Sequence, residues 1–395
     1  MIAFPKKKRN SFSNLQAKNN KFRVRPKKNK PWIVKIILIL NIIAGLCLIA
    51  SYAASLISPG KIWILAFFGL AYPIFLVLNL ILVILWIIMW KKYVFISIIL
   101  ILLGWNQLTS LYPFRFSGIK PENKNHLSVF SYNVHSLYRY ERAESIPETR
   151  SKVTEFLSSH QGDIVCIQEF FAIGQEYSQT ISRFTKALGL TYYYYKNYQD
   201  FWDKTKLNAI ATFSRYPIVN HGEFRLETKT YFAIYTDILY DSDTIRVYNL
   251  HLESIRFGDE DMSFYSHLTN PGTETPPLKP GSQKIMWKLK KAFFNRAKQV
   301  DILARDIKNC PYPVIICGDF NDTPFSYTYN KLVSGLNDAY KSAGYGIFGE
   351  TYAGKLPAFR IDYIFYCDFF SASGYRKFEV NLSDHYPIAA ILNKN

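Results

Sequence analysis

Two polar side chains, Asp319 and Asn321, follow directly on a short apolar run at residues 314–317. A carboxylate can bind a hard cation or take a proton from water, and an amide can help to orient that water. The run is typical of a buried strand, and Gly318 ends it where the backbone must turn. If strand geometry persists through Phe320, both side chains point the same way. The pair alone is weak support for a site, because Asp, Asn and Gly are ordinary turn residues.

Polar side chains of the same chemical kinds stand at the ends of other apolar runs. They are Asn133, Glu169, His251, Asp362, Asp384 and His385. Each alone has a plain structural explanation as a turn residue, a helix-entry charge, a core histidine or a helix cap. Their shared position at predicted strand ends favours a site, because loops above a rigid sheet are where sites collect.

Six short segments that contain these residues occur in order along the chain. They are Ser131-Tyr132-Asn133-Val134, Gln168-Glu169, Asn249-Leu250-His251, Gly318-Asp319-Phe320-Asn321, Arg360-Ile361-Asp362-Tyr363-Ile364 and Ser383-Asp384-His385-Tyr386-Pro387. The series resembles the endonuclease/exonuclease/phosphatase superfamily, which includes DNase I-like nucleases, abasic-site endonucleases, neutral sphingomyelinases and inositol polyphosphate 5-phosphatases. The resemblance covers about residues 127–392 and extends to Asn208-Ala209-Ile210, although Leu207 stands where glycine is common. It is specific for the superfamily and not for a substrate.

The resemblance implies a metal-dependent hydrolase of phosphoester bonds that uses magnesium, with manganese as the alternative ion. It makes Glu169 the main metal ligand and places Asn133 and Asp384 near the same cation. Hard oxygen ligands of this kind suit such an ion. Asn249 and Asn208 are expected to bind substrate.

The resemblance also assigns catalytic roles. Asp319 is expected to orient or deprotonate the attacking water, with help from Asn321. His385 is expected to contact the phosphoryl oxygens, while Asp362 holds its ring and favours the charged form. His251 is expected to bind the phosphate or to assist the leaving group.

The elements that must position these residues follow from hydrophobic periodicity. We expect strands at 127–134, 163–168, 191–195, 209–213, 231–239, 244–250, 314–317, 361–366 and 389–392, and helices at 147–160, 177–188, 284–309 and 327–343. Strands and helices mix without strict alternation, which favours a two-sheet α/β sandwich with helices outside. The resemblance names this fold as DNase I-like. Residues 253–283 are rich in Pro, Gly, Ser and Thr and are expected to form a loop.

Three apolar runs precede this region, at residues 32–57, 62–90 and 93–111. The first two are long enough to cross a bilayer, and Pro73 predicts a kink in the second. No acidic residue occurs before residue 116, which disfavours three buried core helices. The alternatives are a signal peptide within the first run and an interfacial position for the third. The sequence therefore predicts three transmembrane helices and an integral membrane protein.

Charge fixes the predicted orientation. Residues 1–30 hold eleven Lys or Arg, and Lys91-Lys92 lies between the second and third runs. Basic flanks favour the cytoplasmic side, so three crossings carry the rest of the chain out of the cytoplasm. We expect a basic cytoplasmic tail (1–31), a membrane anchor (32–111), a linker (112–125) and an extracytoplasmic catalytic domain (126–395) in a bacterial inner or plasma membrane.

Three hypotheses about function remain open. The total charge of +18 leaves only about +2 for residues 116–395, which gives little support for a nucleic-acid groove. The first hypothesis is a phosphodiesterase or phosphatase acting on lipid head groups or other extracytoplasmic phosphoesters. The second is an extracytoplasmic DNA or RNA endonuclease, and the third is a catalytically dead, membrane-tethered binding module. We infer no obligate protein partner. Cys310 and Cys367 could pair, and no spacing indicates structural zinc.

Overall fold

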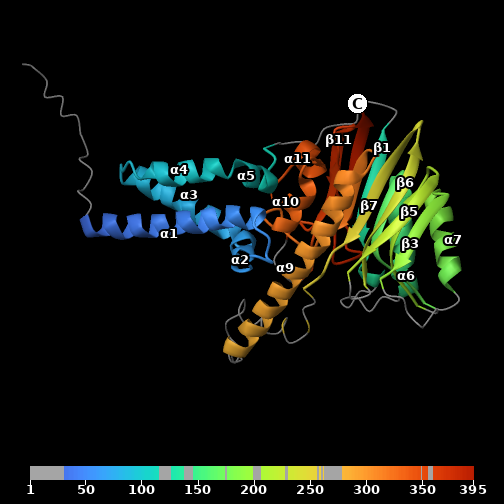
Figure 1. Ribbon diagram of the computed structural model, residues 1–395, viewed down its shortest axis with the longest axis horizontal. Coiled ribbons are helices and arrows are strands. Elements are labelled where there is room, and N and C mark those ends of the chain that lie inside the picture. Colours follow the sequence, from blue (N-terminus) through green and yellow to red (C-terminus); the bar gives the residue numbers. More distant parts are fainter. Residues whose placement is uncertain are drawn as a thin grey trace, which may run out of the picture.

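The structure is a computed structural model that describes residues 31–114, 126–137, 146–173, 176–198, 206–226, 230–255, 258, 261, 278–347, 349–354 and 359–395. Figure 1 shows two bodies, a layered α/β sandwich and a bundle of N-terminal helices that projects from one side of it. The predicted basic tail up to residue 30 and the linker from residue 115 lie outside the described ranges.

The sandwich consists of two six-stranded mixed sheets. The first has the order β11 (Phe370–Lys377), β12 (Ile388–Lys394), β1 (Leu127–Asn133), β2 (Ile164–Ile173), β4 (Lys206–Ser214), β3 (Tyr192–Asn197). The second has the order β5 (Ile218–Arg225), β6 (Tyr231–Tyr240), β7 (Asp243–His251), β8 (Val314–Asp319), β10 (Asp362–Tyr366), β9 (Asn337–Asp338). Among the described strands, only β1–β2 and β7–β8 pair in parallel, at the centre of each sheet. The prediction of a two-sheet α/β sandwich is confirmed.

The central strands are buried on both faces. Between the sheets, Val129, Cys166, Val247, Cys317 and Ile364 belong to one apolar core. A second core lies under α6 (Ile146–His160) and α7 (Glu176–Leu188), and a third lies under α9 (Leu278–Asn309) and α10 (Tyr327–Val333). Burial on both faces explains why these strands are near-continuous apolar runs in the sequence.

Several elements differ from the sequence-based expectation. Helix α9 begins at Leu278, inside the loop expected at 253–283, and residues 256–257, 259–260 and 262–277 of that loop lie outside the described ranges. The single helix expected at 327–343 is wrong: α10 ends at Val333, and strand β9 precedes α11 (Ala339–Ala343). Gly335 has a φ of +79°, which continues no helix. The three strands that the periodicity missed, β5, β9 and β11, are sheet edges. Edge strands are partly exposed and therefore lack the apolar run that identifies a central strand.

Five helices form the N-terminal bundle: α1 (Pro31–Leu56), α2 (Ile64–Leu70), α3 (Tyr72–Ile88), α4 (Val94–Leu103) and α5 (Trp105–Leu111). Within the described residues only α1 is long and apolar enough to cross a membrane alone. The second and third predicted spans are bent pairs, α2–α3 by 62° and α4–α5 by 73°. The first bend is at Ala71, two residues before Pro73, which is close to the predicted kink. The predicted three transmembrane helices are therefore not confirmed, because there are three spans only if each bent pair crosses as one.

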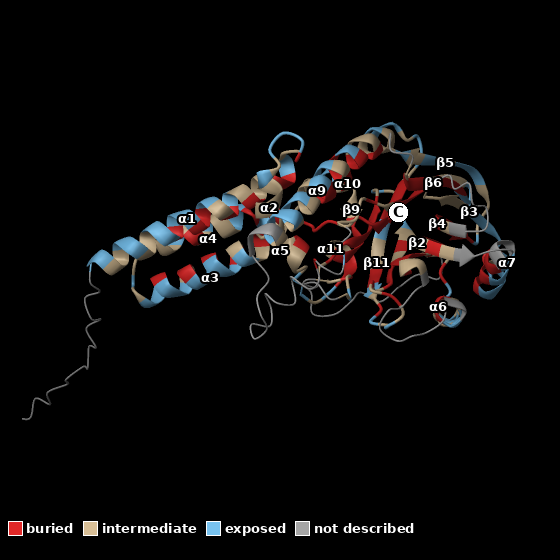
Figure 2. Ribbon diagram, turned by 90° about the horizontal axis from the view of Figure 1, so that it is seen from below, coloured by how far each residue is buried: buried red, intermediate tan, exposed pale blue. Residues whose placement is uncertain are grey.

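The bundle buries polar as well as apolar side chains in its interior and exposes apolar side chains on its outside. Asn41 Nδ2 donates to Ser97 Oγ (2.7 Å), Ser97 Oγ donates to Asn79 Oδ1 (3.0 Å), and Trp86 Nε1 donates to Asn41 Oδ1 (2.8 Å). All four side chains are buried, whereas much of the outer surface of α1, α3 and α4 is exposed (Figure 2). This inverts the distribution expected for helices that face water.

All five cysteines are free, so the pairing considered for Cys310 and Cys367 does not occur. The Sγ atom of Cys367 instead accepts a hydrogen bond from Val314 N at 3.2 Å.

Candidate active site

Asp319 is the centre of the site. It is the last residue of β8 and lies opposite His251, the last residue of the parallel strand β7. Its carboxylate is 1% exposed and accepts hydrogen bonds from Asn133 Nδ2 (3.0 Å) and Asn321 Nδ2 (3.1 Å). Because β1 and β8 belong to different sheets, the bond from Asn133 joins the two sheets at the edge where their parallel strands end.

Asn321 reaches Asp319 through a turn rather than along a strand. Strand geometry ends at Asp319, and Asn321 has a φ of +52°, in the left-handed region. Its backbone N donates to Asp319 Oδ1 at 2.8 Å. The expected common direction of the two side chains is therefore achieved by an Asx-type turn, which Asn tolerates better than most residues.

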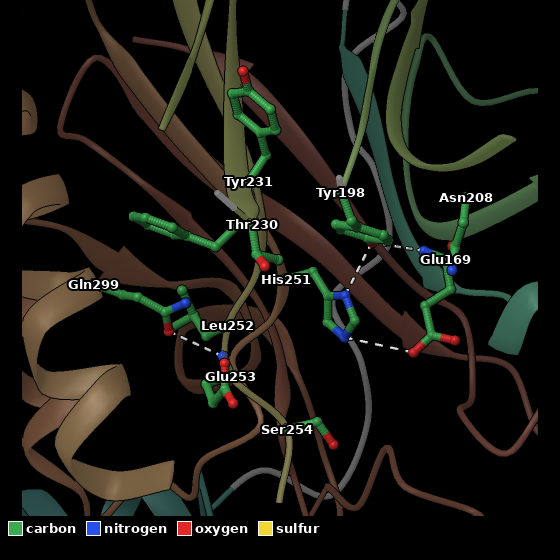
Figure 3. Close-up of a pocket in the computed structure, with 11 residues that line it drawn as sticks. Glu169, Tyr198, Asn208, Thr230, Tyr231, His251, Leu252, Glu253, Ser254 and Gln299 are labelled. Carbon is green, nitrogen blue, oxygen red and sulfur yellow. Dashed lines mark hydrogen bonds and ion pairs between the residues drawn. The ribbon is translucent and has the colours of Figure 1, made fainter. Parts of the chain in front are cut away.

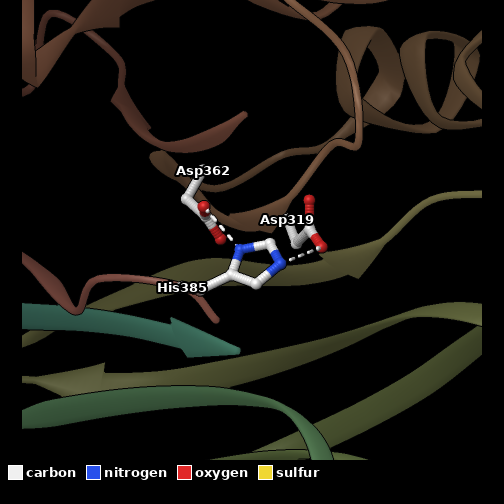
Figure 4. A group of neighbouring side chains, drawn as sticks. All are labelled: Asp319, Asp362 and His385. Atoms are coloured by element: carbon white, nitrogen blue, oxygen red, sulfur yellow. Dashed lines mark hydrogen bonds and ion pairs between the residues drawn. The ribbon is translucent and has the colours of Figure 1, made fainter. Parts of the chain in front are cut away.

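His385 lies between two buried carboxylates (Figure 4). Its Nδ1 lies 2.9 Å from Asp362 Oδ2, and its Nε2 lies 3.7 Å from Asp319 Oδ2. Among the described residues, these three form the group of His, Cys, Asp and Glu side chains close enough together to hold a metal ion. A protonated His385 offsets one of the two negative charges of this group.

Burial and charge set the protonation of this group. Burial disfavours the charged form of His385, but Asp362 and Asp319 outweigh it and raise the pKa of the ring well above its ordinary value. Burial raises the pKa of Asp319 to about 6, although His385 opposes the rise. Near neutral pH the geometry therefore favours an Asp319 carboxylate beside a His385 imidazolium.

His251 faces Glu169 across the open side of the site (Figure 3). Its Nε2 lies 3.6 Å from Glu169 Oε1 and 3.7 Å from Asp319 Oδ2. Its Nδ1 hydrogen-bonds Tyr198 Oη at 2.9 Å, and Glu169 N donates to the same oxygen at 2.9 Å. Burial raises the pKa of Tyr198 well above its ordinary value, so the phenol stays neutral. Tyr198 thus holds both His251 and the backbone of Glu169.

A second set of oxygen atoms favours positive charge. His135 Nδ1 lies 3.0 Å from Asp384 Oδ1, and Ser136 Oγ donates to Glu169 Oε2 at 3.2 Å. The hydrogen bond to Asp384 raises the pKa of His135, and the charge of Glu169 adds to the rise. Burial works against the charged form of Asp384, yet the bond to His135 leaves its pKa below the ordinary value. Carboxylates that stabilise an imidazolium also suit a divalent cation, so Glu169 and Asp384 fit the predicted metal site.

Strained backbone surrounds these oxygen atoms. His135, Ser136, Glu169 and Asn321 all have φ values between +46° and +54°. Residues other than glycine pay for this conformation, and such residues concentrate at functional sites. The strain supports a functional reading of the loop after β1 and of the irregular pairing of β2 with β4 between Ile167 and Phe170.

The two predicted substrate-binding amides lie in different surroundings. Asn249 is fully buried between the sheets, where its Oδ1 accepts from Gln168 Nε2 (2.7 Å) and its Nδ2 donates to Ala211 O (2.8 Å). The structure does not bring it to the open site. Asn208 instead lines a cavity of about 350 Å³ together with Glu169, Tyr198 and His251.

A larger cavity of about 490 Å³ lies over Asp319. Seven of the ten sequence-predicted site residues line it: Asn133, Glu169, His251, Asp319, Asn321, Asp384 and His385. Asp362 lies behind His385, outside this lining. The structure thus gathers at one place residues that are up to 252 positions apart, and their individual roles stay predictions.

Sequence reasoning missed His135, Ser136 and Tyr198. The first has a signal, because it follows Asn133 by two residues at a strand end. Tyr198 has none, since it is one of five tyrosines within residues 192–198 and nothing in the sequence separates it from the others.

Two models of protein families match this chain, one over the sandwich and one over the helical bundle. Residues 130–385 match the model of the Endonuclease/Exonuclease/phosphatase family, and residues 34–111 match a domain of unknown function, DUF8431. No curated protein sequence matches the chain.

Solved structures are similar to this chain at low sequence identity. An endonuclease/exonuclease/phosphatase from Beutenbergia cavernae is 16% identical, with a TM-score of 0.50 over 69% of this chain and 72% of that one. The human Nocturnin catalytic domain is 20% identical, with a TM-score of 0.49 over 71% of this chain and 97% of that one. A mannosyl-6-phosphatase from Bacteroides thetaiotaomicron is 18% identical, with a TM-score of 0.45 over 68% of this chain and 99% of that one.

Proposed function

The chain belongs to the endonuclease/exonuclease/phosphatase family, whose members are phosphoester hydrolases, and from this premise we propose that it is a membrane-tethered, magnesium-dependent phosphoester hydrolase. The observation that carries the proposal is the buried Asp319 carboxylate with two amide donors and two histidines around it. Such a carboxylate can hold a water molecule in one orientation and accept its proton.

Each step of the hydrolysis has a residue to perform it. The oxygen of the water forms the new bond to phosphorus while its proton passes to Asp319. The bond from phosphorus to the leaving oxygen breaks with its electron pair, and that oxygen takes a proton from the ring of His251. The imidazolium of His385 meets the charge that develops on the phosphoryl oxygens, and its position between two carboxylates needs no rearrangement during the reaction.

We assign the proposed metal ion to the two carboxylates that favour positive charge. Glu169 and Asp384 would hold it, with Asn133 nearby, because that is where the surrounding carboxylates favour a cation. When bound, a magnesium ion neutralises phosphate oxygens and polarises the phosphoester. Manganese offers the same preference for oxygen ligands.

The surface of the helical bundle supports membrane tethering. Large apolar side chains on its outside are mostly exposed, for example Leu46 (60%), Ile84 (57%) and Leu103 (72%). Contiguous exposed apolar surface of this extent needs a lipid or protein cover. The buried amide and hydroxyl network of Asn41, Asn79 and Ser97 is the kind of contact that joins helices within a membrane.

The path of the helices is compatible with the predicted orientation. The start of α1 and the turn between α3 and α4 lie at the end of the bundle far from the sandwich (Figure 1), and Lys91 and Lys92 belong to that turn in the sequence. Basic residues at that end favour its placement on the cytoplasmic side, with the sandwich on the other. This would put the catalytic domain outside the cytoplasm.

The test uses the full chain in detergent micelles with bis(p-nitrophenyl) phosphate. We expect turnover with magnesium, loss of turnover with chelator, and a fall of at least about 10³-fold in Asp319→Asn. Asp241→Asn makes the same change at an exposed turn between β6 and β7 and is expected to retain full activity. Folded protein without metal-dependent turnover, or equal activity of the two variants, would reject the proposal.

A further inference from the structure

The cavity over Asp319 has a polar floor and an apolar wall. The wall consists of Leu70, Ile255, Leu289, Phe293, Phe359 and Ile361. Leu70 is the last residue of α2, so the N-terminal bundle itself contributes to the cavity. A wall of this kind offers no hydrogen bond to a phosphate or a sugar, but it can bury an aliphatic chain.

The bundle is fixed to the loop that follows the catalytic strand. The rings of Tyr72 and Phe325 have centroids 4.3 Å apart, and Phe325 is six residues after Asp319. A Cβ on Gly69 would lie 2.9 Å from Phe325 O, so the backbone of α2 approaches this loop as closely as glycine allows.

A second attachment joins α5 to the segment that precedes β10. Arg360, two residues before Asp362, donates from Nη2 to Ser110 O (3.1 Å) and from Nη1 to Asp338 Oδ2 (2.7 Å). Lys341 Nζ donates to Asn106 Oδ1 at 2.6 Å. The bundle is therefore held beside both catalytic carboxylates, which a mere tether would not require.

The first half of α9 continues the apolar wall outward. Phe293 packs against Phe67 of α2 with centroids 5.4 Å apart, and Lys290 Nζ lies 4.5 Å from the ring of Trp63 and 4.6 Å from that of Trp287. Trp287 is 60% exposed, and Phe294 and Met286 are exposed nearby. Tryptophan beside lysine is typical of segments at the boundary between lipid and water.

We infer that the bundle is part of the substrate site and that the substrate is a phosphoester carried by a membrane lipid. The apolar chain of the substrate enters between α2 and α9, along Leu70, Leu289 and Phe293. Its phosphate lies on the polar floor at Asp319, His251 and His385. The inference rests on the proposed function, in which the apolar exterior of the bundle lies in the membrane. With the bundle there, this opening lies at the membrane surface.

The experiment compares lipids with their soluble counterparts. The full chain is reconstituted in phosphatidylcholine vesicles that contain either phosphatidic acid or sphingomyelin, and glycerol 3-phosphate and glycerophosphocholine are the matched soluble phosphoesters. We expect kcat/KM for one lipid to exceed that for its soluble counterpart by at least about 10-fold, since only the lipid uses the apolar wall. Equal values for both pairs, or a preference for plasmid DNA, would overturn the inference.

Variants of the wall provide the second test. Leu70→Asn and Leu289→Asn are expected to lower the lipid rate at least about 10-fold more than the rate with bis(p-nitrophenyl) phosphate. Val219→Asn, at an exposed position of the edge strand β5, is expected to alter neither rate. Parallel loss of both rates in both wall variants would contradict a role in lipid binding.

The two proposals can fail separately. Turnover of bis(p-nitrophenyl) phosphate that needs Asp319 but shows no lipid preference rejects the lipid site and retains the hydrolase. Absence of all turnover rejects the hydrolase itself.

Discussion

Asp362 Oδ2 lies 2.9 Å from Nδ1 of His385, and both side chains are buried. This contact turns the opposite ring nitrogen of His385 toward Asp319 and the cavity. A carboxylate in this position does two things at once: it fixes the direction of the ring, and it stabilises its positive charge.

Asp362→Asn should therefore damage catalysis without removing any group from the cavity lining. The amide keeps the shape but not the charge, so the pKa of His385 should fall, although Asp319 still raises it. We expect kcat/KM with bis(p-nitrophenyl) phosphate to fall about 10²- to 10⁴-fold. Titration of ¹⁵N-labelled histidine by NMR would check the cause, and an unchanged His385 pKa would argue against it. Asp241→Asn serves as the matched control.

The pH dependence of activity should report Asp319. Its pKa is raised to about 6, chiefly by burial, and only the ionised form can take a proton from water. We expect log(kcat/KM) to fall with unit slope below about pH 6 and to level off above it. The measurement is a pH–rate profile at saturating magnesium. An acidic limb at the pKa of an ordinary aspartate, near 4, would show that burial does not control this group.

The burial that raises the pKa of Asp319 should also lower the stability of the folded protein near neutral pH. A pKa that is raised in the folded state means that the charged carboxylate destabilises the fold at pH values above both pKa values. Asp319→Asn should then increase the free energy of unfolding at pH 7.5 in chelator, by on the order of 1–3 kcal/mol. The gain should disappear below about pH 4, where Asp319 is protonated in both states. Thermal melts at the two pH values test this, and a variant that is less stable at pH 7.5 would contradict it.

Glu169→Gln should act on the metal. The amide removes the charge that, with Asp384, makes this part of the cavity favourable for a cation. We expect the magnesium concentration for half-maximal activity to rise at least about 10-fold, with weaker binding by calorimetry. Glu155→Gln on the exposed face of α6 is the control. Unchanged binding in Glu169→Gln would place the metal elsewhere, for example at the group of Asp319, Asp362 and His385.

The catalytic domain could be predicted from the sequence where a buried apolar run is followed directly by a polar residue. Residues such as Asp319 and His251 end apolar runs, and the parallel pairing of β7 with β8 makes those runs end side by side. Asn249 shows the limit of this argument. It also stands near the end of an apolar run, yet it points between the sheets and bonds Gln168. Periodicity identifies which residues share a face, but not how far along the strand the open site begins.

The contacts of the bundle could not be predicted. Leu70, Gly69 and Tyr72 are ordinary residues of an apolar segment, and nothing local indicates that Phe325 lies against them. Contacts between distant segments depend on packing that a single sequence does not reveal. The bends at Ala71 and Gly104 also depend in part on packing between distant segments. A Cβ on Gly104 would lie 2.2 Å from the ring of Tyr52.

The attachment through Arg360 leads to the last prediction. Arg360 and Asp338 form an ion pair with both side chains 1% exposed. Arg360→Met should leave Asp338 charged and buried, at a cost of about 3–5 kcal/mol in the free energy of unfolding. The double variant Arg360→Met/Asp338→Asn removes that charge and should recover part of the loss, as a double-mutant cycle in detergent would measure. If the double variant is less stable than Arg360→Met alone, the ion pair is not what holds this part of the fold.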